Sequence, residues 1–276
     1  MKQQTKPVGE AEVTIHSSGL APTTLPISTD MLLEDAGSGL QEMGRDDLAI
    51  PRLGILQALS PQVQPRDASY VEGAQAGDIL DNIAVKAYPG EQGFAAIVVS
   101  YHKANLEWVP RNKGGGFVAD HGNDPSILTQ CKQVDGRFVL PNGNEISQTA
   151  EYFLLVLDGD TVRQAVISMS STQLRHSRRL NTLMATYTIP HPNDATKRIQ
   201  APIFYRAYRF KTGPEKNDKG SWFGWVIEPA EDTLKLPNGT ELYLRARNFR
   251  QQVAEGTVKV ADPATKPVAE GDDVPF

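Results

Sequence analysis

The chain has 276 residues, a net charge of −5, 39% hydrophobic and 22% charged residues, which is an ordinary composition for a soluble globular protein. No run approaches the ~20 consecutive apolar residues of a membrane helix, and the N-terminus lacks the apolar stretch of a secretion signal. The single cysteine, Cys131, excludes an intramolecular disulfide and fits a reducing cytosol.

The charge is distributed unevenly along the chain. Residues 161–250 contain 15 Lys or Arg and 7 Asp or Glu, a net charge of +8, whereas residues 1–160 and 251–276 are acidic. The local field, and not the total charge, decides where a polyanion docks. Residues 161–250 are therefore the candidate footprint for a nucleic acid, unless these basic residues only form an ordinary solvated face.

Three regions follow from composition. Residues 1–44 are rich in Gly, Ser, Thr and Pro and predict a flexible N-terminal segment, in which Gly37 and Gly39 weaken a short helix over Met31–Met43. Residues 45–253 predict a folded body. Residues 254–276 lack a core pattern and predict a disordered acidic tail.

The body is predicted to be mainly β. It begins with an extended apolar segment, Leu48–Leu59, that Ser60 and Pro61 end. Gly159-Asp160 predicts a tight turn between two strands, and Asn142-Gly143 predicts the type I′ turn of a second hairpin over Phe138–Ile146. Strands are predicted, in chain order, at Gly77–Lys86, Gly93–Lys103, Leu106–Pro110, Glu151–Asp158, Thr161–Met169, Ile203–Lys211 and Ser221–Pro229.

Two helices are predicted within this body. Ser170–Tyr187 has apolar residues at helical spacing and is stopped by Ile189-Pro-His-Pro192, and Thr240–Glu255 ends at Gly256. Many short strands with one helix between them are typical of an OB-like Greek-key barrel, here with insertions. We therefore expect a mainly β fold of that type.

One strand combines aromatic and basic residues as a single nucleic-acid strand requires. In Phe204–Lys211, alternation places Arg206 and Tyr208 on one face and Tyr205 and Arg209 on the other. Bases stack on such rings while Arg and Lys neutralise phosphates. One of the two faces has to belong to the core, so the alternation alone leaves the binding face open. The candidates from this region are Tyr205, Arg206, Tyr208, Arg209, Lys211, Trp222 and Trp225.

Two further patches are candidate phosphate contacts. Arg175, Arg178 and Arg179 lie within one turn of the predicted helix, although a solvated helix face has the same pattern. Trp108, Arg111 and Lys113 precede three glycines, an arrangement that fits either a backbone-binding loop or a plain surface loop.

Catalysis and metal binding are poorly supported. The histidines show no HExxH spacing, and a zinc site would need the unusual set His102, His121 and Cys131. Asp158-Gly-Asp160 is better explained as a turn. We expect no enzyme activity, no cofactor and no metal.

The chain closes with Glu270-Gly-Asp-Asp-Val-Pro-Phe276. This ending resembles the C-terminal tip of bacterial single-stranded DNA-binding proteins and of their T7-like phage counterparts, although two acids here precede the aliphatic residue. A terminal Phe offers a ring and a carboxylate together to a pocket with a basic rim. The resemblance implies that Asp272, Asp273, Val274, Pro275 and Phe276 recruit partner proteins such as polymerase, helicase or nuclease.

Together these patterns predict a phage single-stranded DNA-binding protein in the host cytoplasm. It would coat strands without sequence preference during DNA replication, recombination or repair. The alternatives are a strand-annealing recombinase, a phage transcription or interaction cofactor that does not bind DNA, and a nuclease.

Overall fold

The computed structural model describes residues 29–36, 38–40, 42–43, 47–159, 161–218 and 220–261. The chain forms two compact units, Met1–Met43 and Gly44–Phe276. In the first unit, α1 (Thr29–Glu34) begins within two residues of the short helix expected there. Residues 1–28 of the predicted flexible segment 1–44, and residues 262–276 of the predicted tail 254–276, lie outside the described residues. Disorder from residue 254 onwards is wrong for the start of that tail, because Ala254 ends a helix and Lys259–Val260 form a strand that pairs with Ala49–Ile50.

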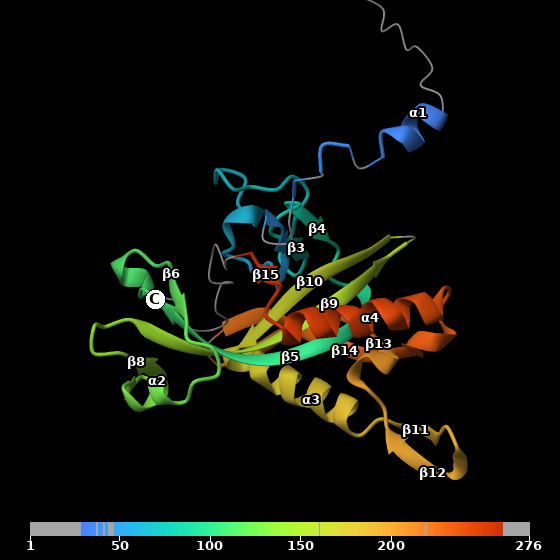
Figure 1. The fold of residues 1–276 in the computed structure, drawn as a ribbon. Helices are drawn as coiled ribbons and strands as arrows, with labels where there is room; N and C mark the ends of the chain where they lie inside the picture. The colour runs from blue at the N-terminus through green and yellow to red at the C-terminus, as the bar shows by residue number, and fades with distance from the viewer. Residues whose placement is uncertain are drawn as a thin grey trace, which may run out of the picture. The chain divides into compact units, whose positions relative to one another are not determined.

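The second unit is built on a curled sheet that forms a half-barrel, so the predicted mainly β class is confirmed (Figure 1). Five strands follow one another across the sheet in the order β14-β13-β5-β9-β10. A helix, α3 (Leu174–Ala185), connects the third of them along the chain to the fourth, as in an OB-like Greek key. The strands are β5 (Phe94–Trp108), β9 (Glu145–Asp158), β10 (Thr161–Ser170), β13 (Arg206–Asn217) and β14 (Gly220–Asp232).

Additional elements extend this sheet. β2 pairs in parallel with β10, β3 pairs with β2, and β4 pairs with β3. A separate pair joins β1 in parallel to β15 near the end of the described chain. The bounds are β1 (Ala49–Ile50), β2 (Arg52–Ile55), β3 (Ile79–Asp81), β4 (Lys86–Tyr88) and β15 (Lys259–Val260).

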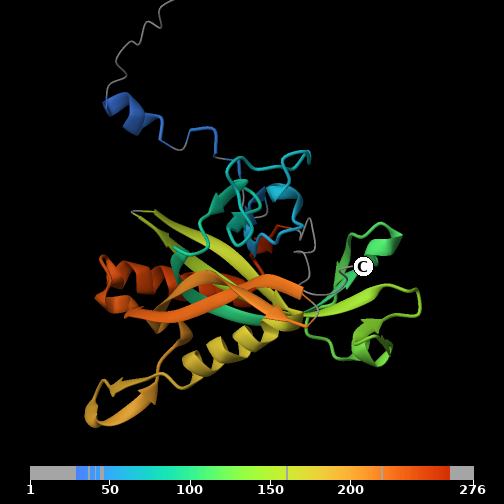
Figure 2. The ribbon, with the colours of Figure 1, turned by 180° about the vertical axis from the view of Figure 1, so that it is seen from behind.

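Two insertions depart from the barrel. The first, residues 109–144, lies between β5 and β9 and contains β6 (Phe117–Asp120), α2 (Ser126–Thr129), β7 (Lys132–Val134) and β8 (Arg137–Val139). The second is a hairpin of β11 (Thr188–His191) and β12 (Asp194–Gln200), which projects away from the barrel beyond the end of α3 (Figures 1 and 2).

Both faces of the central strands are buried. Leu180 and Met184 of α3 close the interior of the half-barrel, where they join the inward residues of all five strands. On the outer face, α4 (Gly239–Ala254) packs Leu242, Ala246 and Phe249 against apolar residues of β5, β9 and β10. The Tyr152 hydroxyl on β9 ties α3 to the sheet through Ser177 Oγ at 2.7 Å. None of the described helices is long and apolar enough to cross a membrane.

Two buried glutamines bridge the open side of the half-barrel. Gln57, just after β2, donates to the Phe223 carbonyl at 2.9 Å and accepts from its N–H at 2.8 Å. Gln173, before α3, accepts from the Trp225 N–H at 3.0 Å. A side-chain amide carries one donor group and one acceptor, as a peptide unit does. These side chains therefore bond backbone groups of Phe223 and Trp225 on the edge of β14 that no strand of the described chain covers.

The main differences from expectation lie in long strands and insertions. The segments Gly93–Lys103 and Leu106–Pro110 form one strand, β5, and the hairpin at Asn142-Gly143 is present between β8 and β9. Its turn is not the predicted type I′, because of the two central residues only Gly143 has a positive φ, and the Gly143 N–H donates to the Leu140 carbonyl at 2.8 Å. The segment Ile203–Lys211 begins as a 3-10 turn, η5 (Ile203–Tyr205), before β13 starts. Ile189-Pro-His-Pro192 does stop the helix, but it also opens the β11–β12 hairpin, which sequence patterning did not predict.

Candidate nucleic-acid interface

Four of the five aromatic residues predicted to stack on bases are buried. Trp108 is 3% exposed, Tyr208 1%, Trp222 7% and Trp225 2%. Burial raises the pKa of Tyr208 to about 12 because the charged phenolate is poorly solvated there. These rings have no free face for a base in this structure. This corrects the expectation that they line the binding surface.

The burial follows from the register of β13. Tyr208 and Phe210 turn inward against Phe94 and Trp225, and Arg209 and Lys211 turn outward. The simple alternation fails before that point, because Phe204 and Tyr205 belong to η5 and the pairing shifts between Arg206 and Tyr208. Tyr205 therefore remains half-buried at the surface.

The structure gathers three half-buried tyrosines from distant segments. Tyr205 of η5 lies 6.4 Å, between ring centroids, from Tyr187 at the end of α3 and 6.4 Å from Tyr243 of α4. The Arg206 guanidinium lies over the Tyr187 ring at 4.7 Å from its centroid. We call Tyr187, Tyr205, Tyr243 and Arg206 the tyrosine cluster. It unites two predicted residues, Tyr205 and Arg206, with two that were not predicted.

Hydrogen bonds fix this cluster in place. Tyr187 donates to Asp232 Oδ1 at 2.5 Å, and that hydrogen bond, together with burial, raises the pKa of Tyr187. Lys235 pairs with Asp232 at 3.3 Å and offsets its charge. Arg206 donates from Nε to the Ala230 carbonyl at 2.9 Å, which leaves its terminal nitrogens for other acceptors.

Basic residues of α4 continue from Tyr243. Arg247 and Arg250 follow it at i+4 and i+7, so the three share one flank of the helix, and both arginines are exposed. Arg245 lies on the other flank and donates to the Val162 carbonyl at 3.1 Å. The tyrosine cluster therefore borders exposed cations that the sequence patterns did not single out. The sequence signal that could have identified this surface is the i, i+4, i+7 spacing of Tyr243, Arg247 and Arg250 within a predicted helix.

The predicted cations of β13 point outward but are partly engaged. Arg209 is exposed and donates to the Gln92 carbonyl at 3.1 Å, and Lys211 pairs with Glu228 at 3.0 Å. Exposed charge pairs of this kind are weak and exchange readily with a phosphate.

In the predicted basic patch on α3, an acidic residue of β13 pairs with one of the three arginines. Arg175 pairs with Glu215 of β13, and His176 Nε2 lies 2.7 Å from the same carboxylate, which also accepts from the Trp222 indole at 2.7 Å. Burial lowers the pKa of His176, against the opposing effect of Glu215. Arg178 and Arg179 are exposed. Arg175 is also 53% exposed, but a phosphate would have to displace Glu215 from it.

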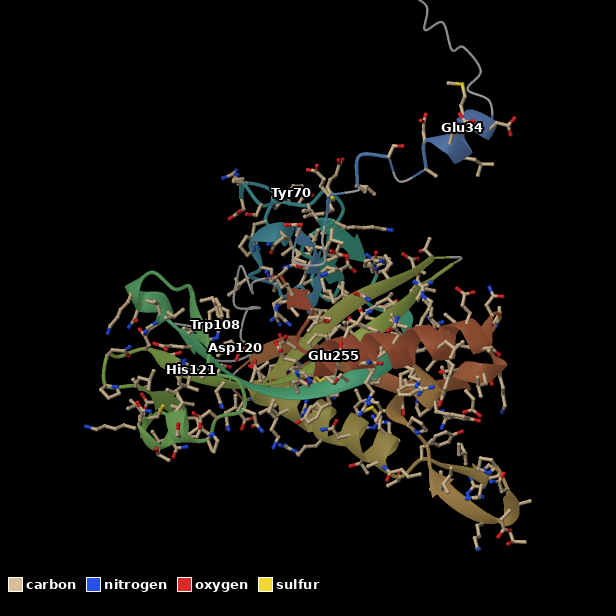
Figure 3. All side chains as sticks on the ribbon, in the orientation of Figure 1. Glu34, Tyr70, Trp108, Asp120, His121 and Glu255 are labelled. Carbon is tan, nitrogen blue, oxygen red and sulfur yellow. The ribbon has the colours of Figure 1, made fainter. Side chains whose placement is uncertain are left out.

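The first insertion separates Trp108 from the other candidates. Trp108 packs edge-on against Phe117 at 5.5 Å between ring centroids, and Asp120, labelled with it in Figure 3, pairs with Leu106 of the same strand. Arg111 and Lys113 occupy the 3-10 turn that follows, and Lys113 is exposed. The structure therefore does not bring this patch to the tyrosine cluster.

No group of three His, Cys, Asp or Glu suited to a metal ion occurs within the described ranges. Instead, His121 Nε2 lies 2.7 Å from the buried Glu107 carboxylate, and His102 contacts Ser100 at 3.2 Å. The three residues of the unusual zinc set are therefore not assembled as ligands.

The profile of the Pam3 phage gp34-like protein family matches residues 21–259. The chain belongs to this family. Membership makes it a phage protein, as the sequence predicted. Searches of curated proteins and of solved structures found no match. The match to the Pam3 phage gp34-like family ends at residue 259, so the predicted tip, Asp272–Phe276, lies beyond it and outside the described residues.

Proposed function

We propose that this phage protein is a non-enzymatic single-stranded DNA-binding protein with little sequence preference. The observation that carries the proposal is the tyrosine cluster, in which Tyr187 just after α3, Tyr205 of η5 and Tyr243 of α4 lie together with a guanidinium at the surface of an OB-like half-barrel. Every base has a π-face, so aromatic platforms bind single strands of any sequence.

The position of this surface is consistent with the fold. OB barrels commonly bind oligonucleotides on the face of their second and third strands and with the adjoining loops. Here α4 covers the outer face of the corresponding strands, β9 and β10, with apolar contacts. A strand of DNA is therefore excluded from that face, and the tyrosine cluster at the edge of α4 takes its place.

The charges favour a polyanion at the same place. Arg206 lies within the cluster, Arg247 and Arg250 continue along α4, and Arg209 turns outward from β13. Neutralising phosphates releases condensed counterions, so affinity is expected to fall steeply with salt.

The stacking role is tested with single-tyrosine variants. Tyr205→Leu and Tyr243→Leu keep an apolar side chain at each position but remove the π-face, and each is expected to weaken labelled oligo-dT binding by ~1–3 kcal/mol, about 5- to 150-fold. Fluorescence anisotropy at two salt concentrations measures the affinity. Tyr70→Leu is the matched control, because Tyr70 is 38% exposed on the loop between β2 and β3 (Figure 3).

The results separate the competing functions. Unchanged affinity in both cluster variants, with wild-type protein binding DNA, removes the cluster from the interface. If the wild-type protein does not bind oligo-dT, DNA binding is excluded, and the alternative of an interaction cofactor that does not bind DNA is favoured. Equal affinity for duplex and single strand favours a duplex-binding role.

The second part of the proposal is recruitment through the tail. Deleting Glu270–Phe276 is expected to leave DNA binding intact, or to tighten it at low salt, since an acidic tethered segment competes with DNA for basic groups. Adding one residue after Phe276 moves the terminal carboxylate while keeping every acidic charge. If the extended chain still binds replication or recombination proteins as strongly as the wild type, recognition of the terminal carboxylate by a basic pocket is wrong.

A further inference from the structure

The hairpin Thr188–Gln200, here called the arm, leaves the barrel at the tyrosine cluster. Its strands pair from Thr188↔Gln200 to Pro190↔Arg198, and it extends away from the body in both views (Figures 1 and 2). All residues of β12 after Asp194 are exposed. An isolated two-stranded hairpin is only marginally stable in water. An arm with so little packing is the kind of element that a bound partner orders.

Local hydrogen bonds hold the arm in shape. At its root, the Ala201 N–H donates to the Tyr187 carbonyl at 3.0 Å, and Arg198 Nε donates to Thr188 Oγ1 at 2.8 Å. At its tip, Asp194 accepts from the Thr196 hydroxyl at 2.6 Å and pairs with Lys197 at 3.1 Å. The single acidic residue of the arm is thus engaged within its own turn.

The arm continues the tyrosine cluster in both position and charge. Tyr187 is at once the root of the arm and the ring beneath Arg206. Lys197, with 74% of its side chain exposed, and Arg198 lie along β12, and Arg178 and Arg179 are exposed on the helix before the arm. A base stacked on Tyr187 would place the next phosphates of its strand beside these cations.

We propose that the arm is a second DNA-contacting element, which binds the phosphates of the single strand whose bases stack on the tyrosine cluster. The proposal rests on the proposed function and adds to it the path of the strand, from Tyr243 past Tyr187 and onto β12. The arm therefore contributes only to strands long enough to reach beyond the cluster.

The test compares two lengths of oligo-dT, about four and about sixteen nucleotides, which bracket the usual site sizes of OB folds. In Lys197→Gln/Arg198→Gln, two cations are lost from the arm. Binding of the long oligonucleotide is expected to lose about 1.4 from its slope of log affinity against log salt, at ~0.7 per phosphate. Binding of the short oligonucleotide is expected to remain unchanged.

Two further variants keep the result specific. Arg66→Gln/Lys132→Gln removes the same charge from exposed positions elsewhere and is expected to leave both slopes unchanged. Replacing Pro190–Arg198 by Asn-Gly shortens the arm to a two-residue turn on the Ile189↔Ile199 pair and keeps the backbone hydrogen bond from Ala201 to Tyr187 at the root. It is expected to speed dissociation of the long oligonucleotide only.

The failures are distinguishable. If the wild type binds DNA and the arm variants show the same salt dependence as the wild type, the arm does not contact DNA, and the proposed function is unaffected. An equal change for both oligonucleotides, or for the Arg66/Lys132 control, overturns it as a general charge effect. If the shortened variant forms a smaller oligomer than the wild type while its salt dependence of DNA binding is unchanged, the arm contacts a second copy of the chain and does not contact DNA. Absence of DNA binding by the wild type removes both proposals together.

Discussion

Two groups of aromatic residues in this protein have different environments. Phe94, Tyr208, Phe210 and Trp225, the aromatic wall, are buried inside the half-barrel, where Phe94 and Phe210 stack at 5.5 Å and Trp225 meets Phe210 edge-on at 6.1 Å. The tyrosine cluster lies at the surface, half-buried, with an arginine over one ring. Tyr205 and Tyr208 are three positions apart and belong to different groups.

The comparison teaches that an aromatic-basic sequence pattern combines two roles. The wall supplies buried apolar area, which stabilises the fold. In the cluster, Tyr243 packs against the buried Phe204 ring at 5.0 Å between centroids, and all three tyrosines stay half-buried at the surface, as a stacking platform requires. Substitutions in the wall should therefore change stability alone, and substitutions in the cluster should change DNA binding.

The largest expected effect is on the wall. Trp225→Ala removes a buried ring and leaves a cavity, so the free energy of unfolding is expected to fall by ~3–5 kcal/mol. Urea denaturation measures this change, and oligo-dT affinity per folded molecule should be unaltered. All three tryptophans are buried, so their emission should follow unfolding and remain insensitive to DNA. Quenching by oligo-dT in the folded protein contradicts the division between wall and cluster.

A pair of variants at one position sharpens the cluster side. Tyr187→Leu removes the ring beneath Arg206, and a loss of ~1–3 kcal/mol in oligo-dT binding is expected. Tyr187→Phe keeps the ring and removes only the donor to Asp232, so DNA binding should be nearly unchanged while stability falls by ~1 kcal/mol. Equal binding losses in the two variants mean that the hydroxyl, and not the π-face, contacts the strand.

A polar counterpart of the wall lies where β5 meets the first insertion. Hydrogen bonds, first from Asn144 at 2.5 Å and then from His121, lower the pKa of the buried Glu107 carboxyl, against the effect of burial. A depressed pKa stabilises the fold above the unfolded value, near 4.5, and this stabilisation is lost as pH falls through the folded value.

Glu107→Gln is therefore expected to cost ~1–3 kcal/mol at pH 7 and to flatten the loss of stability below about pH 4.5. Thermal unfolding between pH 3 and 7 measures it, with Glu72→Gln on an exposed loop as the control. If Glu107→Gln loses stability between pH 7 and 3 in the same way as the wild type, other carboxyl groups are responsible for the acid sensitivity.

The smallest effect concerns a strained turn far from both groups. Val85, at the β3–β4 turn, has a φ of 50° and is 58% exposed, a conformation that a β-branched residue rarely adopts. Asp81 holds this turn by accepting from the Ile83 and Ala84 N–H groups at 3.0 and 2.9 Å. Val85→Asn is expected to raise stability by up to ~1 kcal/mol with unchanged DNA binding. A lower melting temperature contradicts the strain.

Local patterns predicted the elements that depend on neighbouring residues. The Asn142-Gly143 hairpin, the helix over residues 170–187 and the helix ending near Gly256 appear close to their expected positions, because turn chemistry and helical spacing act within a few residues. Alternation also separated Arg209 from Tyr208. It could not show which face was the core, since both faces of that strand carried aromatic and basic residues.

By itself, the sequence determined a mainly β phage protein whose positive charge is concentrated in residues 161–250. Only the tertiary structure decided which aromatic residues are available. Tyr187, Tyr205 and Tyr243 meet because the segment after α3, η5 and α4 converge at one edge of the half-barrel, a contact between residues far apart in the chain. The inward turn of β13 buries Tyr208 and Trp225 through the same long-range packing, since the side that faces the core depends on the strands and helices that cover it.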